Sequence, residues 1–139
     1  MKPYDKPLPK IDALNAPYWE GAKAGELRIQ ACGHCGRHSA DPARLCMSCG
    51  SPELSWVAAS GRARLWSFGI FHKAYFPSFA PDVPYNVAIV ELEEGPRLYS
   101  NIVGVANDDI KVGMPLKVHF EAVTDGVTLV KFAPAPDGP

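Results

Sequence analysis

The chain has 139 residues, of which 47% are hydrophobic and 21% are charged, and its formal net charge is −1. This length is enough for one compact domain with a small appendage and too short for two full enzyme domains. The near-neutral charge provides no global attraction to a nucleic-acid backbone or to an anionic membrane, so composition indicates neither partner.

Residues 1–25 are predicted to form an extended arm followed by a short helix. Prolines are frequent among the first ten residues, where they remove backbone donors and fix φ, which favours an extended chain. A helix is predicted from Pro17 to Ala24, with Asn15 as its N-cap and Gly25 as its terminator. A helix of about two turns is not stable alone, so it must pack against the rest of the chain, through Tyr18, Trp19 and Ala22.

The cellular compartment is inferred from the amino-terminal residues. They carry prolines and charges where a signal peptide would need an apolar run, and no stretch of the sequence approaches membrane-spanning length. We therefore expect a cytoplasmic protein without a membrane span. Thiols in the cytoplasm are kept reduced, so closely spaced cysteines there favour a metal site over disulfides.

Two Cys-x-x-Cys pairs dominate the next segment, residues 26–59. Each pair is followed at once by a glycine, Gly36 or Gly50, which leaves backbone room for a tight turn. Four thiolates at this spacing match a tetrahedral metal site, and we predict that the ligands of a structural Zn²⁺ are Cys32, Cys35, Cys46 and Cys49. The alternatives are a redox iron centre of the rubredoxin type, two disulfides, and replacement of a thiolate by His34 or His38.

Short strands are predicted on either side of the two cysteine pairs. The stretch from Glu26 to Ala31 alternates apolar and polar residues, and Leu54 to Ala58 is predicted as a second strand. Cysteine turns between strands are typical of a zinc ribbon. Such a segment has few apolar residues for a core, so we expect the metal to supply most of its folding free energy.

Residues 60–134 are predicted to form a five-stranded barrel of the OB type. Runs rich in Val, Ile, Phe, Tyr and Trp alternate with Gly, Pro, Asn and Asp, and no helix is predicted between them. Gly69 is where the long first strand is expected to bend. Residues 135–139 are predicted to be a disordered tail. The predicted strands are Arg62–His72, Tyr85–Glu93, Arg97–Val103, Leu116–Val123 and Thr128–Ala133. The predicted fold class is thus mainly β: a helical arm, a rubredoxin-like zinc ribbon and an OB-fold barrel.

A long loop from Lys73 to Pro84 separates the first two barrel strands. Loops of this length inside a compact domain tend to be functional, and here prolines limit the flexibility of exposed aromatic residues. Aromatic rings on a stiff loop suit a ligand or a partner, and nearby cations suit a phosphate. The candidate ligand-binding or partner-binding residues are Arg64, His72, Lys73, Tyr75, Phe76, Phe79 and Arg97.

The stretches YWEGAKAGELRIQACGHCG, DVPYNVAIVELEEGPRLYSNIVG and KVGMPLKVHFE occur in an order that resembles a known family. It is similar to the zinc-ribbon/OB-fold acyl-CoA-associated proteins, long called domain of unknown function 35. The resemblance implies a small non-catalytic subunit that binds a thiolase-fold enzyme (thiolase, acyltransferase or aldolase) or a hydratase-like enzyme and helps hold CoA esters. Met47 and Ala63 depart from the family's usual proline and glycine, and neither position is a predicted metal ligand.

No nucleophile elbow, HExxH, P-loop or GxGxxG motif is present, so independent catalysis is not indicated. The alternative function is nucleic-acid binding, because OB barrels and zinc ribbons both recur in that role. Aromatic residues would then stack on bases and arginines would follow the backbone, the candidates being Trp66, Phe68, Tyr99, Arg62, Arg64 and Arg97. We expect core packing to account for most of these aromatic residues, and the chain lacks a dense basic stripe.

Overall fold

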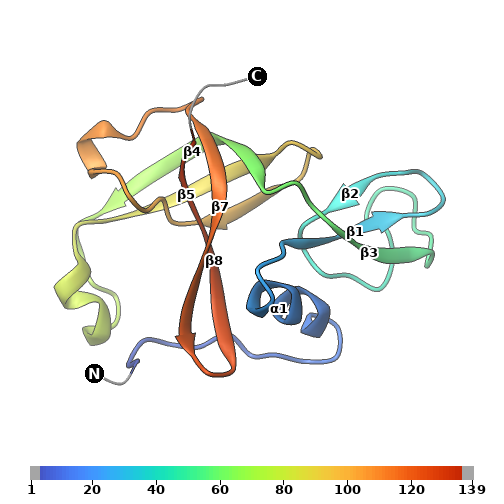
Figure 1. Cartoon of the computed structure of the whole chain (residues 1–139), viewed down its shortest axis with the longest axis horizontal. Coiled ribbons are helices and arrows are strands. Elements are labelled where there is room, and N and C mark those ends of the chain that lie inside the picture. Colours follow the sequence, from blue (N-terminus) through green and yellow to red (C-terminus); the bar gives the residue numbers. More distant parts are fainter. Residues whose placement is uncertain (1–3, 136–139) are drawn as a thin grey trace.

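The computed structural model describes residues 4–135 and consists mostly of strands (Figure 1). In chain order the elements are α1 (Ala16–Lys23), β1 (Arg28–Cys32), β2 (His38–Ser39), β3 (Leu54–Ala58), β4 (Arg62–Phe71), the 3₁₀ helix η1 (Pro77–Asp82), β5 (Tyr85–Leu92), β6 (Arg97–Ser100), the 3₁₀ helix η2 (Asn107–Asp109), β7 (Pro115–Thr124) and β8 (Val127–Pro134). Among the described residues, no helix is long and apolar enough to cross a bilayer.

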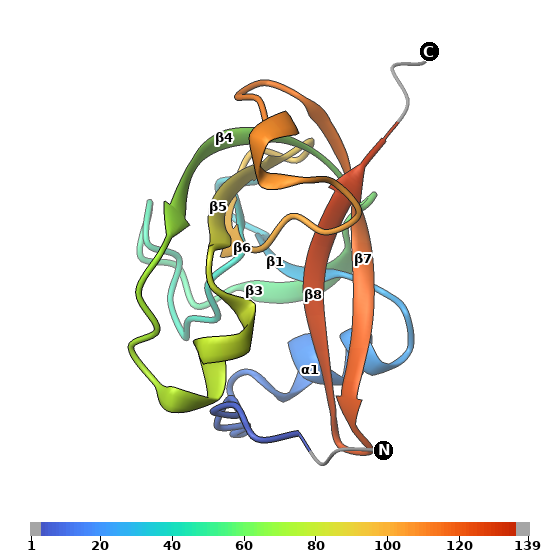
Figure 2. The ribbon, with the colours of Figure 1, turned by 90° about the vertical axis from the view of Figure 1, so that its left-hand side faces the viewer.

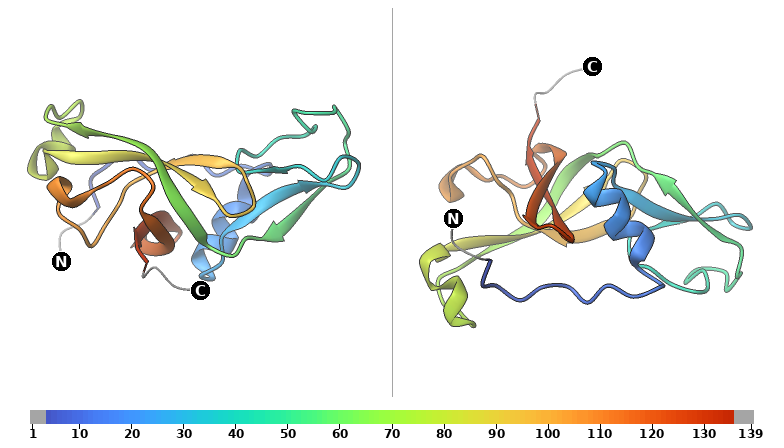
Figure 3. Two further views of the ribbon diagram at one scale, coloured as in Figure 1. Left: turned by 90° about the horizontal axis from the view of Figure 1, so that it is seen from above. Right: turned by 60° about the horizontal axis from the view of Figure 1, so that its bottom comes forward.

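The strands form two antiparallel sheets. The smaller has the order β2-β1-β3, and the larger has the order β6-β5-β4-β7-β8. The larger sheet curls on itself, as Figure 2 shows, and its ends meet where Ile102 pairs in parallel with Phe132. This confirms the predicted mainly β fold with a ribbon followed by an OB-like sheet. The ribbon extends to one side of the barrel, with α1 beside the place where the two meet (Figure 3).

Several local predictions differ from the structure. Strand β2 was not predicted, because two residues are too few for a visible alternation. Strand β6 ends at Ser100 rather than Val103, because the chain there changes its partner from β5 to β8. The irregularity in β4 lies at Trp66, between Leu65 and Ser67, and not at Gly69. Two 3₁₀ helices, η1 and η2, also interrupt the barrel strands, where no helix was predicted.

The barrel core is built from alternate residues of its strands. In β5 the burial alternates strictly along the strand, and Val90 is completely buried, as is Phe132 of β8. Leu27 and Ile29 lie in the same apolar cluster, with exposed fractions of 2% and 0%. The ribbon's base therefore shares the barrel core, and burial contributes to its stability together with any metal. This modifies the expectation that the metal supplies most of the folding free energy.

Helix α1 packs through its buried residues Gly21 and Ala22. Gly21 approaches its neighbours closely, since an added Cβ would lie 2.7 Å from Arg28 Cδ. Asn15 occupies the predicted N-cap position, but its side chain makes no capping hydrogen bond to the helix. It turns back toward the arm instead: Oδ1 accepts from Asp12 N at 2.9 Å, and Nδ2 donates to Lys10 O at 3.0 Å.

The carboxyl-terminal segment is ordered slightly beyond the predicted barrel boundary. Pro134 pairs with Leu116 as the last residue of β8. Ala135 then donates its N–H to Pro115 O at 2.9 Å, so sheet hydrogen bonding reaches one residue into the segment predicted to be disordered. The rest of that predicted tail, residues 136–139, lies outside the described residues.

Candidate metal centre and binding surfaces

The four cysteines converge at one end of the ribbon. Their Sγ atoms all lie within 4.8 Å of one another, and two Sγ–Sγ distances, Cys32 to Cys49 and Cys35 to Cys46, are 3.6 Å. Tetrahedral thiolates with Zn–S bonds of about 2.3 Å would lie about 3.8 Å apart. The donor set therefore fits a tetrahedral metal ion, and four protein ligands leave no open position for water or substrate.

The two cysteine turns have nearly the same backbone. Gly36 donates its N–H to Cys32 O at 3.0 Å, and Gly50 donates to Cys46 O at 2.8 Å. Both glycines have positive φ, 80° and 77°, a conformation that other residues rarely adopt, which explains a glycine after each pair. His34 is exposed and lies outside the sulfur cluster, and its backbone N–H donates to Cys32 Sγ at 3.4 Å.

A buried glutamine joins the two halves of the ribbon. Gln30 Nε2 donates to Ala43 O at 3.0 Å, and Gln30 Oε1 accepts from Ala43 N at 2.8 Å. Gln30 is only 5% exposed and belongs to β1, which leads to the first cysteine turn, whereas Ala43 precedes the second. This reciprocal pair fixes the distance between the turns. Sequence alternation did not single out Gln30, because it only marked the residue as polar.

Backbone donors prepare two of the four sulfurs for metal binding. The N–H groups of Cys49 and Ser48 lower the pKa of the Cys46 thiol to about 6. The pKa of Cys32 is also lowered, chiefly by the N–H of Cys35. Thiolates this close repel one another, so full ionisation of the cluster requires a cation at its centre.

The predicted aromatic loop forms a connected cluster with two strand residues. Tyr75 packs edge-on against Phe71, which stacks on Tyr85 with ring centroids 5.5 Å apart. Phe79 lies 5.7 Å from Tyr85, and Phe76 lies 6.2 Å from Phe79. Tyr75 and Phe76 remain exposed, so the cluster presents both rings to solvent. Phe71 and Tyr85 were not singled out from the sequence.

The predicted cations do not gather at one place. His72 and Lys73 are exposed at the start of the loop, and Lys73 Nζ lies 5.3 Å from the Tyr75 ring centroid. Arg64 and Arg97 lie at the other end of the sheet, six β5 residues or about 20 Å away by strand rise. Arg64 donates to Gly113 O at 3.0 Å, so it does not join Lys73.

Exposure also corrects one sequence expectation. Trp66 and Tyr99 are 49% and 76% exposed, so core packing does not account for them. Only Phe68, of the three aromatic residues considered for base stacking, packs against the core. The Arg97 guanidinium carbon lies 3.6 Å from the Trp66 ring centroid, and Arg97 Nε donates to Glu91 Oε2 at 2.9 Å.

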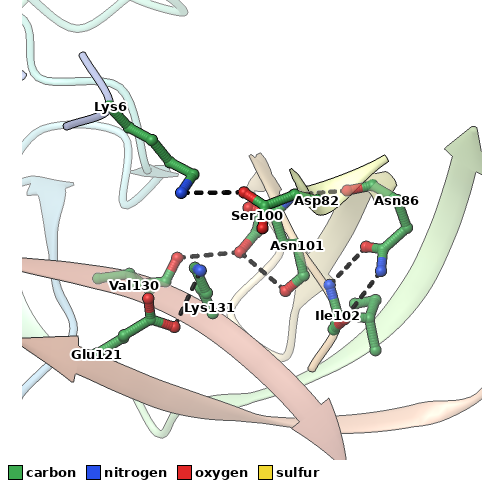
Figure 4. Close-up of polar contacts among 9 residues, drawn as sticks. All are labelled: Lys6, Asp82, Asn86, Ser100, Asn101, Ile102, Glu121, Val130 and Lys131. Atoms are coloured by element: carbon green, nitrogen blue, oxygen red, sulfur yellow. Dashed lines mark hydrogen bonds and ion pairs between the residues drawn. The ribbon is translucent and has the colours of Figure 1, made fainter. Parts of the chain in front are cut away.

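A groove with a volume of about 560 Å³ lies at the mouth of the barrel, between the arm, the loop and the β7–β8 hairpin. Figure 4 shows two ion pairs at its walls: Lys6 Nζ to Asp82 Oδ2 at 3.0 Å, and Lys131 Nζ to Glu121 Oε2 at 2.9 Å. Its floor contains the buried Asn86, which exchanges hydrogen bonds with the backbone of Ile102. Sequence reasoning missed this groove because its walls are far apart in the chain.

The fold and the thiol cluster define a zinc-ribbon protein with an OB barrel. Residues 19–55 match the ChsH2 rubredoxin-like zinc ribbon domain, and residues 56–121 match the ChsH2 C-terminal OB-fold domain. A "DUF35 domain-containing scaffold protein" of Methanothermobacter thermautotrophicus is 33% identical over 68% of this chain and 71% of that protein. The chain belongs to the DUF35 family, which confirms the resemblance drawn from sequence.

A relative of known structure and two longer relatives were also found. A chain of the "Ltp2-ChsH2(DUF35) aldolase" is 38% identical, with a TM-score of 0.82, covering 93% of this chain and 100% of that one. A "Probable enoyl-CoA hydratase alpha subunit" of Thermomonospora curvata is 38% identical over 94% of this chain. A "3-oxo-4,17-pregnadiene-20-carboxyl-CoA hydratase alpha subunit" of Mycobacterium tuberculosis is 35% identical over 81% of it. The matches span only 40% and 35% of these two hydratase subunits.

Proposed function

We propose that this chain is a non-catalytic accessory subunit that binds a thiolase-fold or hydratase-like acyl-CoA enzyme and helps hold its acyl-CoA substrate. The observation that carries the proposal is its similarity, along 93% of its length, to a chain of the Ltp2-ChsH2(DUF35) aldolase. The names of the hydratase subunits and of the Methanothermobacter scaffold protein support the same kind of role.

The thiol cluster is proposed to hold a structural Zn²⁺ in a reducing, cytoplasmic setting. Four thiolates saturate a tetrahedral ion, and closed sites of this kind are commonly structural zinc. The ion would join the two cysteine turns, whose backbones are already alike. Its chemistry would be limited to holding the ribbon, because a saturated zinc ion binds no water to activate.

The exposed loop surface is proposed to contact the acyl-CoA or the enzyme that carries it. Tyr75 and Phe76 offer exposed rings for an adenine or an acyl chain, with Phe79 packed behind them. Lys73 and His72 lie at the same end and suit a phosphate. Because Arg64 and Arg97 lie at the opposite end of the sheet, we assign them to the protein partner instead.

The test is to isolate the tagged chain with its partner from the native cell, identify the partner, and reconstitute it. We expect an acyl-CoA enzyme whose activity requires this chain, while the chain alone is inactive. Replacing Phe76 and Phe79 together by alanine should weaken partner docking or acyl-CoA retention without releasing the metal. Recovery of replication or ribosomal proteins, with salt-sensitive binding to single strands, would favour the nucleic-acid alternative instead.

A further inference from the structure

We propose that the free edge of β6 is a docking site for an extended segment of a partner protein, which adds to the barrel sheet as another strand. The segment would place an apolar side chain in the groove beside Leu98 and a basic side chain at the rim of that groove. This inference rests on the proposed function for the identity of the partner. It concerns a surface distinct from the aromatic loop and from the barrel mouth.

The register of the β5–β6 hairpin leaves two residues of β6 with outward backbone groups. Leu92 donates its N–H to Pro96 O at 2.9 Å at the start of the pairing. Hydrogen-bonded pairs alternate along an antiparallel ladder, so the even-numbered residues of β6 bond to β5. The N–H and C=O groups of Arg97 and Tyr99 therefore point away from β5. Within residues 4–135, β5 is the only neighbour of β6 in the sheet order, and none of the backbone hydrogen bonds outside the paired strands involves these groups.

The continuation of the strand follows the same alternation. Asn101 O accepts from Phe132 N at 3.1 Å, and Val103 N donates to Phe132 O at 2.8 Å. These odd-numbered residues also point away from β5, but β8 covers them. Figure 4 shows this tied region, where Ser100 Oγ also donates to Val130 O. The edge is thus closed by β8 after Ser100 and open before it.

The side chains at the open edge have the composition of an interaction surface. Arg97 stacks on Trp66 at 3.6 Å and pairs with Glu91, so its guanidinium is held in place. Tyr99, which pairs with Ile89 of β5, is 76% exposed on the same face of the sheet as Arg97. Trp, Tyr and Arg are the residues that most often carry binding energy at protein interfaces.

A groove of about 370 Å³ runs along the open edge, between β6, α1 and the loop after β2. Leu98, Leu14 and Pro42 contribute apolar surface to it, which suits one apolar side chain of an added strand. Asp12 and Asp41 also line it, and neither forms an ion pair among the described residues. This uncompensated charge favours a segment with a lysine or arginine next to its apolar residue.

Strand addition explains these features together. An added strand would satisfy the four outward backbone groups of Arg97 and Tyr99, while the groove would select its side chains. Exposed strand edges otherwise promote aggregation, and proteins reduce this risk by keeping such strands short. β6 has four residues, so the surface is large enough for a short segment and too small to favour unlimited pairing.

The experiment compares Tyr99→Pro with Tyr99→Ala in binding to the purified acyl-CoA enzyme that defines the proposed function. Both variants remove the ring, but only proline removes the outward N–H, which the β5 ladder does not use. We expect Tyr99→Pro to bind about tenfold more weakly than Tyr99→Ala, because an acceptor on the partner loses its donor. In parallel, amide exchange of the wild-type chain should show Arg97 and Tyr99 protected only in the complex, which keeps the test valid should Tyr99→Pro fold poorly.

The docking proposal would be overturned if the two variants bound with equal affinity, or if complex formation did not slow amide exchange at Arg97 and Tyr99. Either result would leave the proposed function standing. Failure of the wild-type chain to bind the enzyme would overturn both. The same amides could instead be protected in the free chain, with protection that rises with protein concentration as dimers form. That result would assign the edge to a second copy of the chain and overturn the proposed occupant.

Discussion

Lys6 Nζ lies 3.0 Å from Asp82 Oδ2, which ties the amino-terminal arm to η1 of the aromatic loop. The lysine also lies 5.6 Å from the Phe79 ring centroid, so one side chain contacts both the charge and the aromatic cluster of that loop. The pKa of Lys6 is raised, chiefly by its hydrogen bond to Asp82, so the lysine remains charged at neutral pH. The arm is therefore part of the surface that presents the loop.

Lys6→Met should release the loop from the arm. We expect faster amide exchange at residues 76–83 and a global stability loss of no more than about 1 kcal/mol, because the pair is partly exposed. Hydrogen-exchange mass spectrometry measures the first effect and urea unfolding the second. The matched control is Lys131→Met, which breaks the other ion pair of the barrel-mouth groove and should leave exchange in the loop unchanged.

Cys46→Ser should abolish stoichiometric metal binding, because it removes one of four converging ligands. Elemental analysis of the wild-type chain should give about one zinc per chain, and a chelator should loosen the ribbon before the barrel. Ser48→Ala, which keeps the backbone donor to Cys46, serves as the control. A wild-type chain with no bound metal, or with the visible absorbance of ferric thiolate, would contradict zinc.

Gln30→Ala should destabilise the ribbon by about 1 to 3 kcal/mol, because the N–H and C=O of Ala43 both lose their buried partner. The two cysteine turns would then be held at their distance mainly by the metal. We expect a lower apparent metal affinity, measured by competition with a chromogenic chelator. Ser55→Ala, an exposed change on neighbouring β3, should leave that affinity at the wild-type value.

Tyr18→Phe should reduce the loss of unfolding free energy at alkaline pH. Burial raises the pKa of Tyr18 to about 12, whereas an unfolded tyrosine ionises near pH 10. Between these values the unfolded state binds fewer protons, so stability falls as pH rises from 10 to 12. The wild type should lose about 2 to 3 kcal/mol more than Tyr18→Phe over this window.

Local sequence patterns were sufficient to predict the cysteine turns, the barrel strands and the proline-rich loop. The spacing of the cysteines and their following glycines was sufficient to predict the cluster, because each turn closes within five residues. Runs of β-branched and aromatic residues between turn residues located the barrel strands, because these side chains fit the pleated, half-buried surface of a sheet. The proline-rich loop was likewise visible, although its η1 turn was not.

Only the tertiary structure decided how these parts meet. Closure of the sheet through Ile102 and Phe132 created the barrel-mouth groove from segments that no sequence period connects. Register decided that Arg97 stacks on Trp66, far from Lys73, and that the backbone groups of Tyr99 stay open. Such contacts depend on pairing between distant segments, whereas sequence patterns report only how each segment divides its own residues between core and solvent.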